Sequence, residues 1–369
     1  MAARTSLTAA TLTRWRMRHQ MLTGPPADDA PSVVQRLGAV QSQDYPGATW
    51  ALALRMGKRV ARSAINDAFD RGEIVRTHLM RPTWHFVVPG DIRWILQLTG
   101  HRVIASCQSA RNTFGLDAKS VARAMTALQR GLEGGRALGR EEVRTLLARA
   151  RVPCPTTERF AHMLLVAENE GLVCSGPRAG GEHTYMLLDE RVPAQSSTPS
   201  RAESVVELVR RYYRTHGPAT THDFTVWSGL PQGDARDGLE AMGDEVESAE
   251  LDGSTWWFPR ARPAAQRGVV ARLIPNYDEY YIGFKHRAPL LSRLHAGGGS
   301  LTLYQLLQHH IVVDGQVVGS WRRAPSARGG KLTLSPKVPL LPKERAAVDR
   351  EVPRLEAFLG EALADQWTA

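Results

Sequence analysis

The chain has little cysteine: Cys107, Cys154 and Cys174 are the only thiols among its 369 residues. No two of them have the Cys-x-x-Cys spacing of a zinc knuckle or a redox pair, and an odd number does not close a disulfide framework. The histidines have no metal-ligand spacing either. We therefore expect no metal site, no cofactor and a reducing compartment.

Long apolar runs are also missing. No uninterrupted apolar stretch approaches the roughly 18 residues that a membrane helix needs, and Met1 to Ser6 lead into an amphipathic stretch rather than the apolar part of a signal peptide. We therefore expect a soluble cytoplasmic protein, associated with the nucleoid, that has no membrane partner.

The composition is that of a globular protein with a basic surface. Hydrophobic residues make up 43% and charged residues 23% of a chain that is too long for one core. Lys plus Arg number 47 against 37 for Asp plus Glu, a formal charge of +10. This charge favours a polyanionic partner, although a GC-rich genome, which raises arginine everywhere, would give a similar composition.

One order of elements recurs three times: short helices, a helix flanked by basic residues, and a glycine-punctuated pair of strands. This is the pattern of a winged helix, so the sequence predicts an α+β fold of three tandem winged helix-turn-helix units plus a C-terminal β-rich region. The predicted domains are 1–100, with a leading helix and the glutamine motif, 101–195, 196–262 and 263–369. Such units in a basic chain indicate duplex DNA as the partner, and three in one chain remove the usual need for a dimer.

The expected elements follow from apolar periodicity and turn residues. The predicted helices span 8–22, 32–40, 63–71, 91–113, 118–132, 139–147, 157–165, 204–215, 221–227 and 343–363, and a connection from Leu230 leads to 233–239. The predicted strands span 74–77, 83–88, 172–175, 184–188, 246–248, 256–258, 269–274, 302–304 and 311–321. The last of these contains Asp314-Gly315, a strong signal for a two-residue hairpin turn.

The segment Gln41-Ser42-Gln43-Asp44 is the most informative short stretch. It places two neutral amides where the helix predicted over 32–40 ends. Each amide has an acceptor oxygen and two donors that need partners when buried. The pair therefore either lies solvated on the surface or holds a small polar guest such as water.

Five stretches carry a resemblance to a known family. They are 37–44, 76–85, 217–230, 273–283 and 313–321. Together, in order and over nearly the whole chain, they resemble the AlkZ/YcaQ family of bacterial DNA glycosylases. The resemblance implies a C-shaped scaffold of three tandem winged-helix units that lines a basic channel for duplex DNA.

The family's active site is a glutamine, one intervening residue, and a second glutamine or an aspartate. Gln41 and Gln43 match the two-glutamine branch, which is similar to enzymes that protect antibiotic producers from their own DNA-alkylating products. Azinomycin-like and pluramycin-like (for example hedamycin-like) guanine adducts are the substrates that this branch suggests. Ser42 departs from the pattern, because the family usually has an apolar residue there.

The chemistry of the lesion suits a neutral site. Alkylation at guanine N7 or adenine N3 makes the base cationic, so it leaves as a neutral species without a strong general acid. The oxocarbenium-like sugar still needs electron-rich oxygens and an oriented water. The carbonyl groups of Gln41 and Gln43 can supply both. An amide does not titrate between about pH 5 and 9, so the rate of excision should be nearly independent of pH.

Other residues compete for catalytic or binding roles. Asp44 is a candidate base or the cap of the next helical turn, and His85 is a candidate catalyst or a packed, backbone-bonded histidine. His222, followed by Asp223, is a helix-start pair or a DNA contact. The predicted DNA-binding residues share basic or imidazole side chains near turns and helix starts: Arg81, His85, His222, Lys285, Arg287, Arg322 and Arg323. The hairpin at Asp314-Gly315 either inserts into the minor groove or forms an ordinary sheet edge.

Two other classes of protein share parts of this pattern. A non-enzymatic winged-helix transcription regulator would have the same folds and charge, and would bind one DNA sequence tightly. A protein-assembly scaffold would bind DNA weakly and without salt dependence. Both explain less of the glutamine pair than a DNA glycosylase that removes alkylpurines from duplex DNA.

Overall fold

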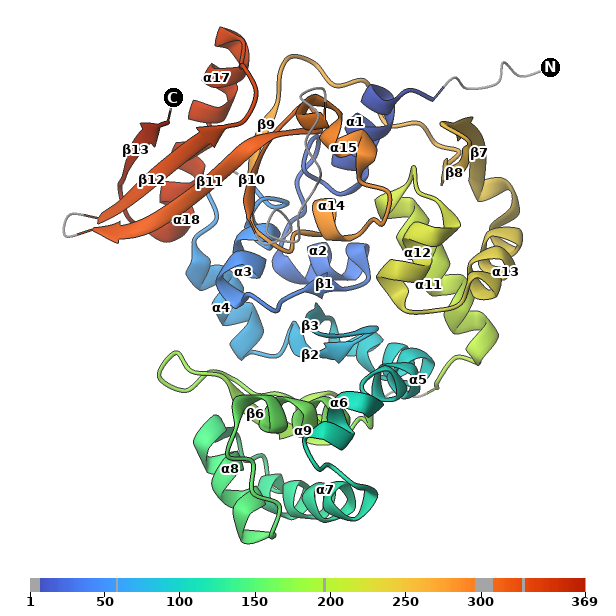
Figure 1. Ribbon diagram of the computed structural model, residues 1–369, viewed down its shortest axis with the longest axis vertical. Coiled ribbons are helices and arrows are strands. Elements are labelled where there is room, and N and C mark those ends of the chain that lie inside the picture. The colour runs from blue at the N-terminus through green and yellow to red at the C-terminus, as the bar shows by residue number, and fades with distance from the viewer. Residues whose placement is uncertain (1–6, 58, 195–196, 296–307, 327–328, 369) are drawn as a thin grey trace. The chain divides into compact units, whose positions relative to one another are not determined.

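The computed structural model describes residues 7–57, 59–194, 197–295, 308–326 and 329–368. The strand expected over 302–304 lies outside these residues. The chain forms two compact units (Figure 1). Unit 1 comprises Met1–Asn66, Val206–Trp227 and Pro231–Ala369, and unit 2 comprises Asp67–Val205 and Ser228–Leu230. The finer division into four domains stays a prediction.

Unit 1 contains most of the N-terminal and C-terminal helices. They are α1 (Ala9–His19), α2 (Ala30–Leu37), α3 (Tyr45–Ala53), α4 (Arg62–Asp70), α11 (Arg201–His216), α12 (Thr221–Ser228), α13 (Gln232–Met242), α14 (Glu279–Ile282), α15 (Ala288–His295), α17 (Pro342–Asp349) and α18 (Val352–Leu359). A 3-10 turn, Gly243–Glu245, follows α13. Helices α4, α11 and α12 continue across the boundary with unit 2.

The strands of unit 1 other than the short β1 form one large sheet and one hairpin. They are β1 (Val40–Gln41), β7 (Val246–Leu251), β8 (Ser254–Pro259), β9 (Ala271–Ile274), β10 (His309–Val313), β11 (Gln316–Ser326), β12 (Gly329–Pro336) and β13 (Leu363–Trp367). β7 pairs with β8, and the large sheet has the order β13-β12-β11-β10-β9. Asp314 and Gly315 both have positive φ, 46° and 85°, in the two-residue turn between β10 and β11. The predicted hairpin is confirmed, because this turn requires that geometry.

Unit 2 alternates helices with short strands. Its elements are β2 (Val75–Leu79), β3 (Arg81–Val87), α5 (Pro89–Ser106), α6 (Gln108–Thr113), α7 (Ala118–Leu132), β4 (Leu138–Gly139), α8 (Arg140–Arg149), α9 (Thr157–Asn169), β5 (Val173–Ser175), β6 (Thr184–Leu187) and α10 (Leu188–Arg191). β2 and β3 form an antiparallel hairpin, and β4, β6 and β5 form a small sheet in that order. The order from α7 to β6 is the one that the sequence predicts, except that β4 was not predicted.

The core of unit 2 shows why α7 forms. Ala124, Leu128 and Leu132 recur every four residues along this helix and are fully buried, which is the spacing of one helical face. Asp117 accepts a hydrogen bond from the Ser120 amide and caps the first turn. Burial of this stripe, more than intrinsic propensity, stabilises a helix of this length.

The structure corrects the C-terminal prediction. The single helix expected over 343–363 is two helices, α17 and α18, followed by strand β13. Pro353 lies in the first turn of α18, where its missing amide hydrogen costs nothing. Gly360 ends that helix in the left-handed conformation, with φ of 71°. The chain then turns and β13 pairs in parallel with β12.

None of the helices in the described part of the chain is long and apolar enough to cross a membrane. The same residues contain no group of three or more His, Cys, Asp or Glu side chains placed to hold a metal ion. The three cysteines are buried free thiols.

Candidate active site

The glutamine segment follows helix α2. This helix begins and ends earlier in the chain than the sequence predicts. Asp29 caps the first turn by accepting a hydrogen bond from the Ser32 amide at 2.8 Å. The helix ends at Leu37 rather than at residue 40, because Gly38 takes φ of +85°, a conformation that glycine adopts without strain. The chain is then extended in β1, so Gln41 lies on a strand and not on a helix end.

The three residues of the motif differ in burial. Gln41 keeps 8% of its surface exposed and Ser42 keeps none, whereas Gln43 is exposed. Ser42 and Gln43 follow β1, and Gln43 lies in a bend before α3. A small serine is thus buried where the resemblance implied an apolar residue, and Gln43 lies at the surface.

A buried carboxylate holds the backbone of the motif. The Glu279 side chain is fully buried, and its Oε1 accepts a hydrogen bond from the Gln41 amide nitrogen at 2.9 Å. Its Oε2 accepts a hydrogen bond from Trp227 Nε1 at 3.0 Å and lies 3.6 Å from His216 Nε2. Burial lowers the pKa of His216 although Glu279 opposes the shift. Glu279 thus fixes Gln41 in place through its main chain.

The residue before Glu279 makes a second buried ion pair. Arg55 donates from Nη1 and Nη2 to the two oxygens of Asp278, both at 2.8 Å, and neither side chain is exposed. Arg55 Nη2 also donates to Gln20 Oε1 at 3.0 Å. Two-point pairing of this kind restricts geometry as well as supplying energy. We call Gln20, Arg55, Asp278 and Glu279 the buried polar frame.

Sequence analysis did not assign a role to this frame. Asp278-Glu279 contributed only to the family resemblance. The available signal was two consecutive acids inside the aromatic run from Tyr277 to Tyr281, because acidic side chains in such a run are buried only when they are paired.

Asp44 occupies the N-cap position of α3, but its side chain makes no capping hydrogen bond. The carboxylate instead lies close to Gly47: a Cβ at that position would lie 2.8 Å from Asp44 Oδ2 and 2.9 Å from Asn276 Oδ1. Any larger residue there would displace the ends of the two side chains, so glycine leaves room for them to approach. Burial lowers the pKa of His309, and the charge of Asp44 opposes that shift. The sequence offered Asp44 as a base or as the cap of the next helical turn; the residue lies at the cap position, but its side chain does not cap the turn and helix α3 itself was not predicted.

Several predicted DNA-binding residues lie in unit 1. His222 and Lys285 are exposed, as are Arg322 and Arg323 on β11. Arg323 Nε donates to Glu361 Oε1 at 2.7 Å. Arg287 is partly buried and donates to the backbone carbonyl of Tyr281 at 2.8 Å, and burial lowers its pKa. DNA contact by each of these residues stays a prediction.

Arg81 and His85 lie together on β3 of unit 2. The His85 ring is fully buried, with Nδ1 2.9 Å from the Thr83 carbonyl oxygen and Nε2 3.1 Å from Arg81 Nη2. The ring therefore donates to the carbonyl and accepts from Arg81. His85 is a packed, backbone-bonded histidine that orients Arg81, and DNA contact at this pair stays a prediction.

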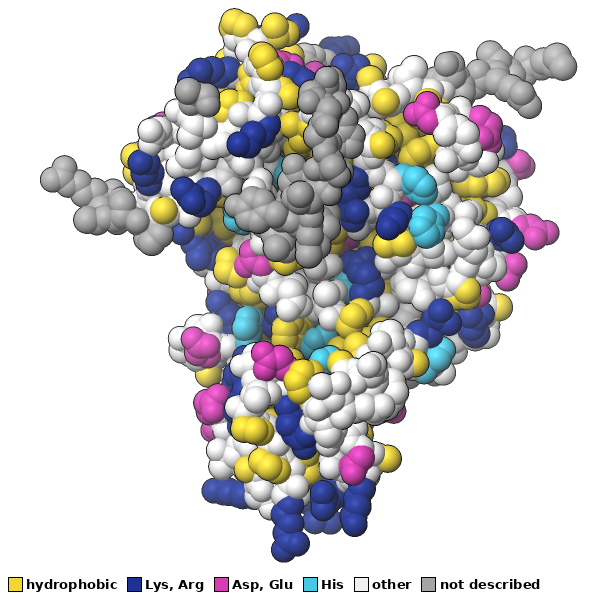
Figure 2. Space-filling view, in the orientation of Figure 1, with side chains coloured by type: hydrophobic (Ala, Val, Ile, Leu, Met, Phe, Trp, Pro, Cys, Tyr) yellow, Lys and Arg dark blue, Asp and Glu magenta, His cyan; other side chains and the backbone are white. Residues whose placement is uncertain are grey.

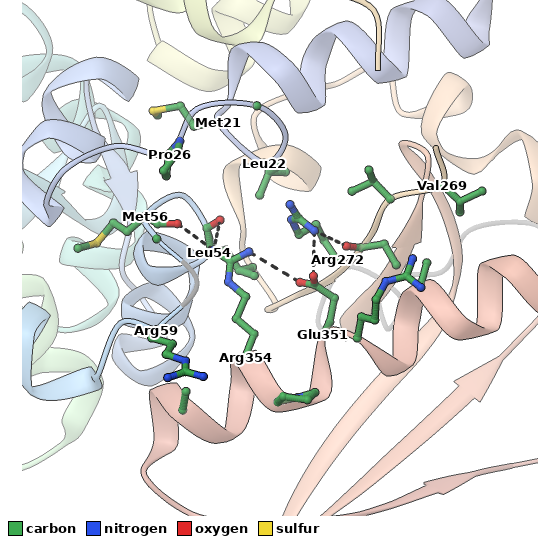
Figure 3. Close-up of a pocket in the computed structure, with 18 residues that line it drawn as sticks. Met21, Leu22, Pro26, Leu54, Met56, Arg59, Val269, Arg272, Glu351 and Arg354 are labelled. Carbon is green, nitrogen blue, oxygen red and sulfur yellow. Dashed lines mark hydrogen bonds and ion pairs between the residues drawn. The ribbon is translucent and has the colours of Figure 1, made fainter. Parts of the chain in front are cut away.

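A hollow of about 900 Å³ in unit 1 does not include either glutamine (Figure 3). Its charged groups serve the fold. Arg272 Nη1 donates to Glu351 Oε1 at 2.9 Å. Burial lowers the pKa of Arg354 to about 10. Arg354 Nη2 donates at 2.8 to 3.0 Å to three carbonyl oxygens after α3, those of Ala53, Leu54 and Met56.

The fold is that of a known DNA glycosylase. The structure matches that of the Streptomyces sahachiroi DNA glycosylase AlkZ with a TM-score of 0.79 and 23% sequence identity, over 99% of this chain and 100% of that chain. This match defines a mixed fold of helices and strands.

The sequence comparisons define the family. The model of the family "DNA glycosylase AlkZ-like" matches residues 34–358. An interstrand DNA cross-link repair glycosylase of Streptomyces sahachiroi is 25% identical over 320 residues, which are 83% of this chain and 85% of that protein. The chain therefore belongs to the AlkZ-like family of DNA glycosylases. It is a monofunctional DNA glycosylase, a hydrolase of N-glycosyl bonds, and not a transcription regulator or a scaffold.

Proposed function

We propose that the enzyme hydrolyses the N-glycosyl bond of bulky N7-alkylguanine and related cationic alkylpurines in duplex DNA. Gln41 and Gln43 position the attacking water and stabilise the oxocarbenium-like sugar with their carbonyl oxygens. The observation that supports this most is the contrast between a main chain fixed at Gln41 by buried Glu279 and an exposed side chain at Gln43. A rigid backbone that presents an amide to solvent suits a preorganised site.

Uncharged groups are sufficient because the lesion supplies its own activation. A cationic base departs as a neutral molecule when the bond between it and the sugar breaks. Water then adds to the sugar carbon and loses a proton to solvent. Ordinary purines need protonation before they leave, so a site without a strong acid spares undamaged DNA.

The substrate class follows from two considerations. A relative is named for repair of interstrand cross-links, which are too large for the snug pocket of a base-flipping enzyme. The glutamine pair belongs to the branch that resembles self-resistance enzymes of antibiotic producers. We infer that the enzyme removes adducts of a genotoxic natural product of the azinomycin or hedamycin type while the lesion stays in the helix.

The proposal includes the scaffold. Three tandem winged-helix segments of a monomer present a C-shaped basic channel to the duplex, and the basic side chains of both units contact its phosphates. The succession of helices and hairpins in the chain and its formal charge of +10 support this inference.

The test is single-turnover release of the base by the double variant Gln41→Ala, Gln43→Ala. Two substrates are used, one with N7-methylguanine and one with a bulky intercalating guanine adduct. We expect loss of release from the bulky substrate of about 100-fold or more, with duplex binding kept within about twofold. Gln232→Ala, which removes an exposed glutamine at the start of α13 in the same unit, is the control. Full activity of the double variant contradicts the catalytic role, and a strict preference of the wild type for the methyl lesion contradicts the substrate class.

A further inference from the structure

A second polar site lies in unit 1, at the start of α12. An open hollow of about 510 Å³ is lined by parts of α12, α13 and β8 and by the segment after α14. Hydrogen-bond donors and cationic side chains dominate this lining: Thr221, His222, Arg236, Thr255 and His286. In Figure 2, histidine side chains lie next to Lys and Arg side chains near the start of α12. The hollow includes neither Gln41 nor Gln43.

His286 has one ring nitrogen engaged in the protein. Its Nδ1 lies 3.1 Å from Asp223 Oδ1 and 3.1 Å from Thr220 Oγ1. The side chain keeps 38% of its surface exposed. Because Nδ1 donates to the carboxylate, Nε2 is the ring atom left to meet a ligand, and it is a donor when the ring is protonated.

Asp223 holds the segment that carries His286. The carboxylate is fully buried and accepts hydrogen bonds from the amide nitrogens of Lys285 at 2.8 Å and His286 at 2.7 Å. Its other oxygen accepts from the Thr220 amide at 2.9 Å. Three backbone bonds from two segments fix the imidazole at the rim of the hollow.

The charges around Asp223 leave a surplus cation at the surface. Arg16 is fully buried, with Nη2 3.7 Å from Asp223 Oδ2 and its guanidinium 3.4 Å from the centre of the Phe284 ring. The one buried anion thus faces Arg16 at Oδ2 and His286 at Oδ1, so protonation of His286 places one more positive charge there than the carboxylate neutralises. The hydrogen bond that His286 donates to Asp223 raises the pKa of His286, although burial and the charges of Arg16 and Lys285 oppose the shift.

We propose that this hollow binds a backbone phosphate of duplex DNA, with His286 as a charged donor placed by Asp223. His222 and Arg236 contribute further positive charge, and the first amides of α12 point their hydrogens towards the same end of the helix. Glu240 is the one acidic side chain of the lining, and it lies on α13, one turn after Arg236. A phosphodiester fits this donor set because its oxygens only accept hydrogen bonds.

This inference rests on the proposed function only in taking duplex DNA as the partner. It gives a structural basis for a phosphate contact at His286, which lies between the predicted DNA-binding residues Lys285 and Arg287, and it adds a dependence of DNA affinity on pH. Binding should weaken as the pH rises through the raised pKa of His286, because the neutral ring loses its charge.

The experiment measures binding of an undamaged duplex by wild type, His286→Gln and His286→Lys as a function of salt. Glutamine keeps a donor for Asp223 and is always neutral, and lysine is always charged. The association constant K falls as salt rises, so its log-log slope is negative. At about pH 6 we expect His286→Gln to make this slope less steep by about 0.9 and to weaken binding about eightfold at 0.1 M salt. At about pH 9 the wild type should approach the glutamine variant, whereas His286→Lys should keep its affinity.

His101→Gln, the loss of an exposed histidine on α5, is the control and should leave the slope unchanged. An unchanged slope for His286→Gln overturns the phosphate site, and so does an equal weakening at both pH values. Base release from alkylated DNA by the double variant Gln41→Ala, Gln43→Ala is a separate readout. Failure of one proposal therefore leaves the other intact.

Discussion

Two carboxylates of unit 1, Glu279 and Asp223, are both fully buried but serve their surroundings in different ways. Glu279 accepts hydrogen bonds from a backbone amide and an indole, so the groups that it supports at the motif are uncharged. Asp223 accepts hydrogen bonds from backbone amides and an imidazole, so the group that it supports carries a positive charge at the surface.

The two proposals separate chemistry from binding. Under them, a site of neutral amides over Glu279 should react at a rate that is independent of pH, whereas a cation held by Asp223 should make DNA affinity depend on pH and salt. Both arrangements use a buried charge to order a backbone segment, and neither carboxylate touches the DNA in the proposed complex. Substitutions at the two positions should therefore have separable effects.

The largest effect is expected for Asp223→Asn. Asparagine keeps an acceptor for the backbone amides but leaves Arg16 buried without its counter-ion, and loss of one partner of a buried pair costs about 3–5 kcal/mol. The measurement is the free energy of unfolding from urea denaturation at several pH values. Asp189→Asn, which removes the carboxylate of an exposed ion pair with Arg93, is the control and should change stability little.

The pH window follows from the two pKa shifts. Burial alone would raise the pKa of Asp223, but the hydrogen bond from His286 and the charge of Arg16 outweigh it and lower the pKa below 3.8. The contribution of Asp223 to the free energy of unfolding is fully present above 3.8 and is lost as the pH falls through the lowered pKa. The contribution of His286 is complete below 6.5 and is lost as the pH rises through the raised pKa. The difference in stability between wild type and Asp223→Asn should shrink below the pKa of Asp223 and above the pKa of His286. A difference that shrinks at neither end would contradict the pairing of Asp223 with His286.

Glu279→Gln should have the next largest effect, on the rate rather than on binding. The amide offers one acceptor to two donors, so either the Gln41 amide or the Trp227 indole faces an NH2 group. Small displacements of a catalytic segment cost about 100-fold in rate. We expect a loss of this order in single-turnover base release, with the affinity and salt slope for undamaged duplex unchanged.

Glu344→Gln supplies the matched control for that experiment. Glu344 pairs with Arg293 at 2.9 Å and its side chain is 12% exposed, so the substitution also removes a partly buried carboxylate from unit 1. Wild-type rates from a folded Glu279→Gln enzyme would show that the frame does not position the motif. A parallel loss of binding would show that Glu279 does not distinguish chemistry from affinity.

Local patterns in the sequence predicted many of the helices and strands. The Asp314-Gly315 turn and the helix over 118–132 depend on neighbours in the chain, and both were predicted. The break between α17 and α18 was missed because the apolar periodicity continues through it, although Pro353 and Gly360 marked the two ends of α18.

The buried polar groups could not be predicted from neighbours in the chain. The amide of Gln41 meets Glu279 across 238 positions, and Asp223 meets His286 across 63. Sequence reasoning identified the glutamines because their spacing is local. It had no means of choosing Glu279 from 37 acidic residues, because only the folded chain shows which carboxylates are buried and paired.

The most direct measurement is the pH profile of single-turnover base release from an N7-alkylguanine duplex, with enzyme in saturating excess so that binding does not contribute. If neutral amides of Gln41 and Gln43 direct the water, the rate stays within about twofold between about pH 5.5 and 9. A sigmoid with a midpoint of about 4 to 7 would identify a carboxylate such as Asp44, or a histidine, as the base and would contradict the account.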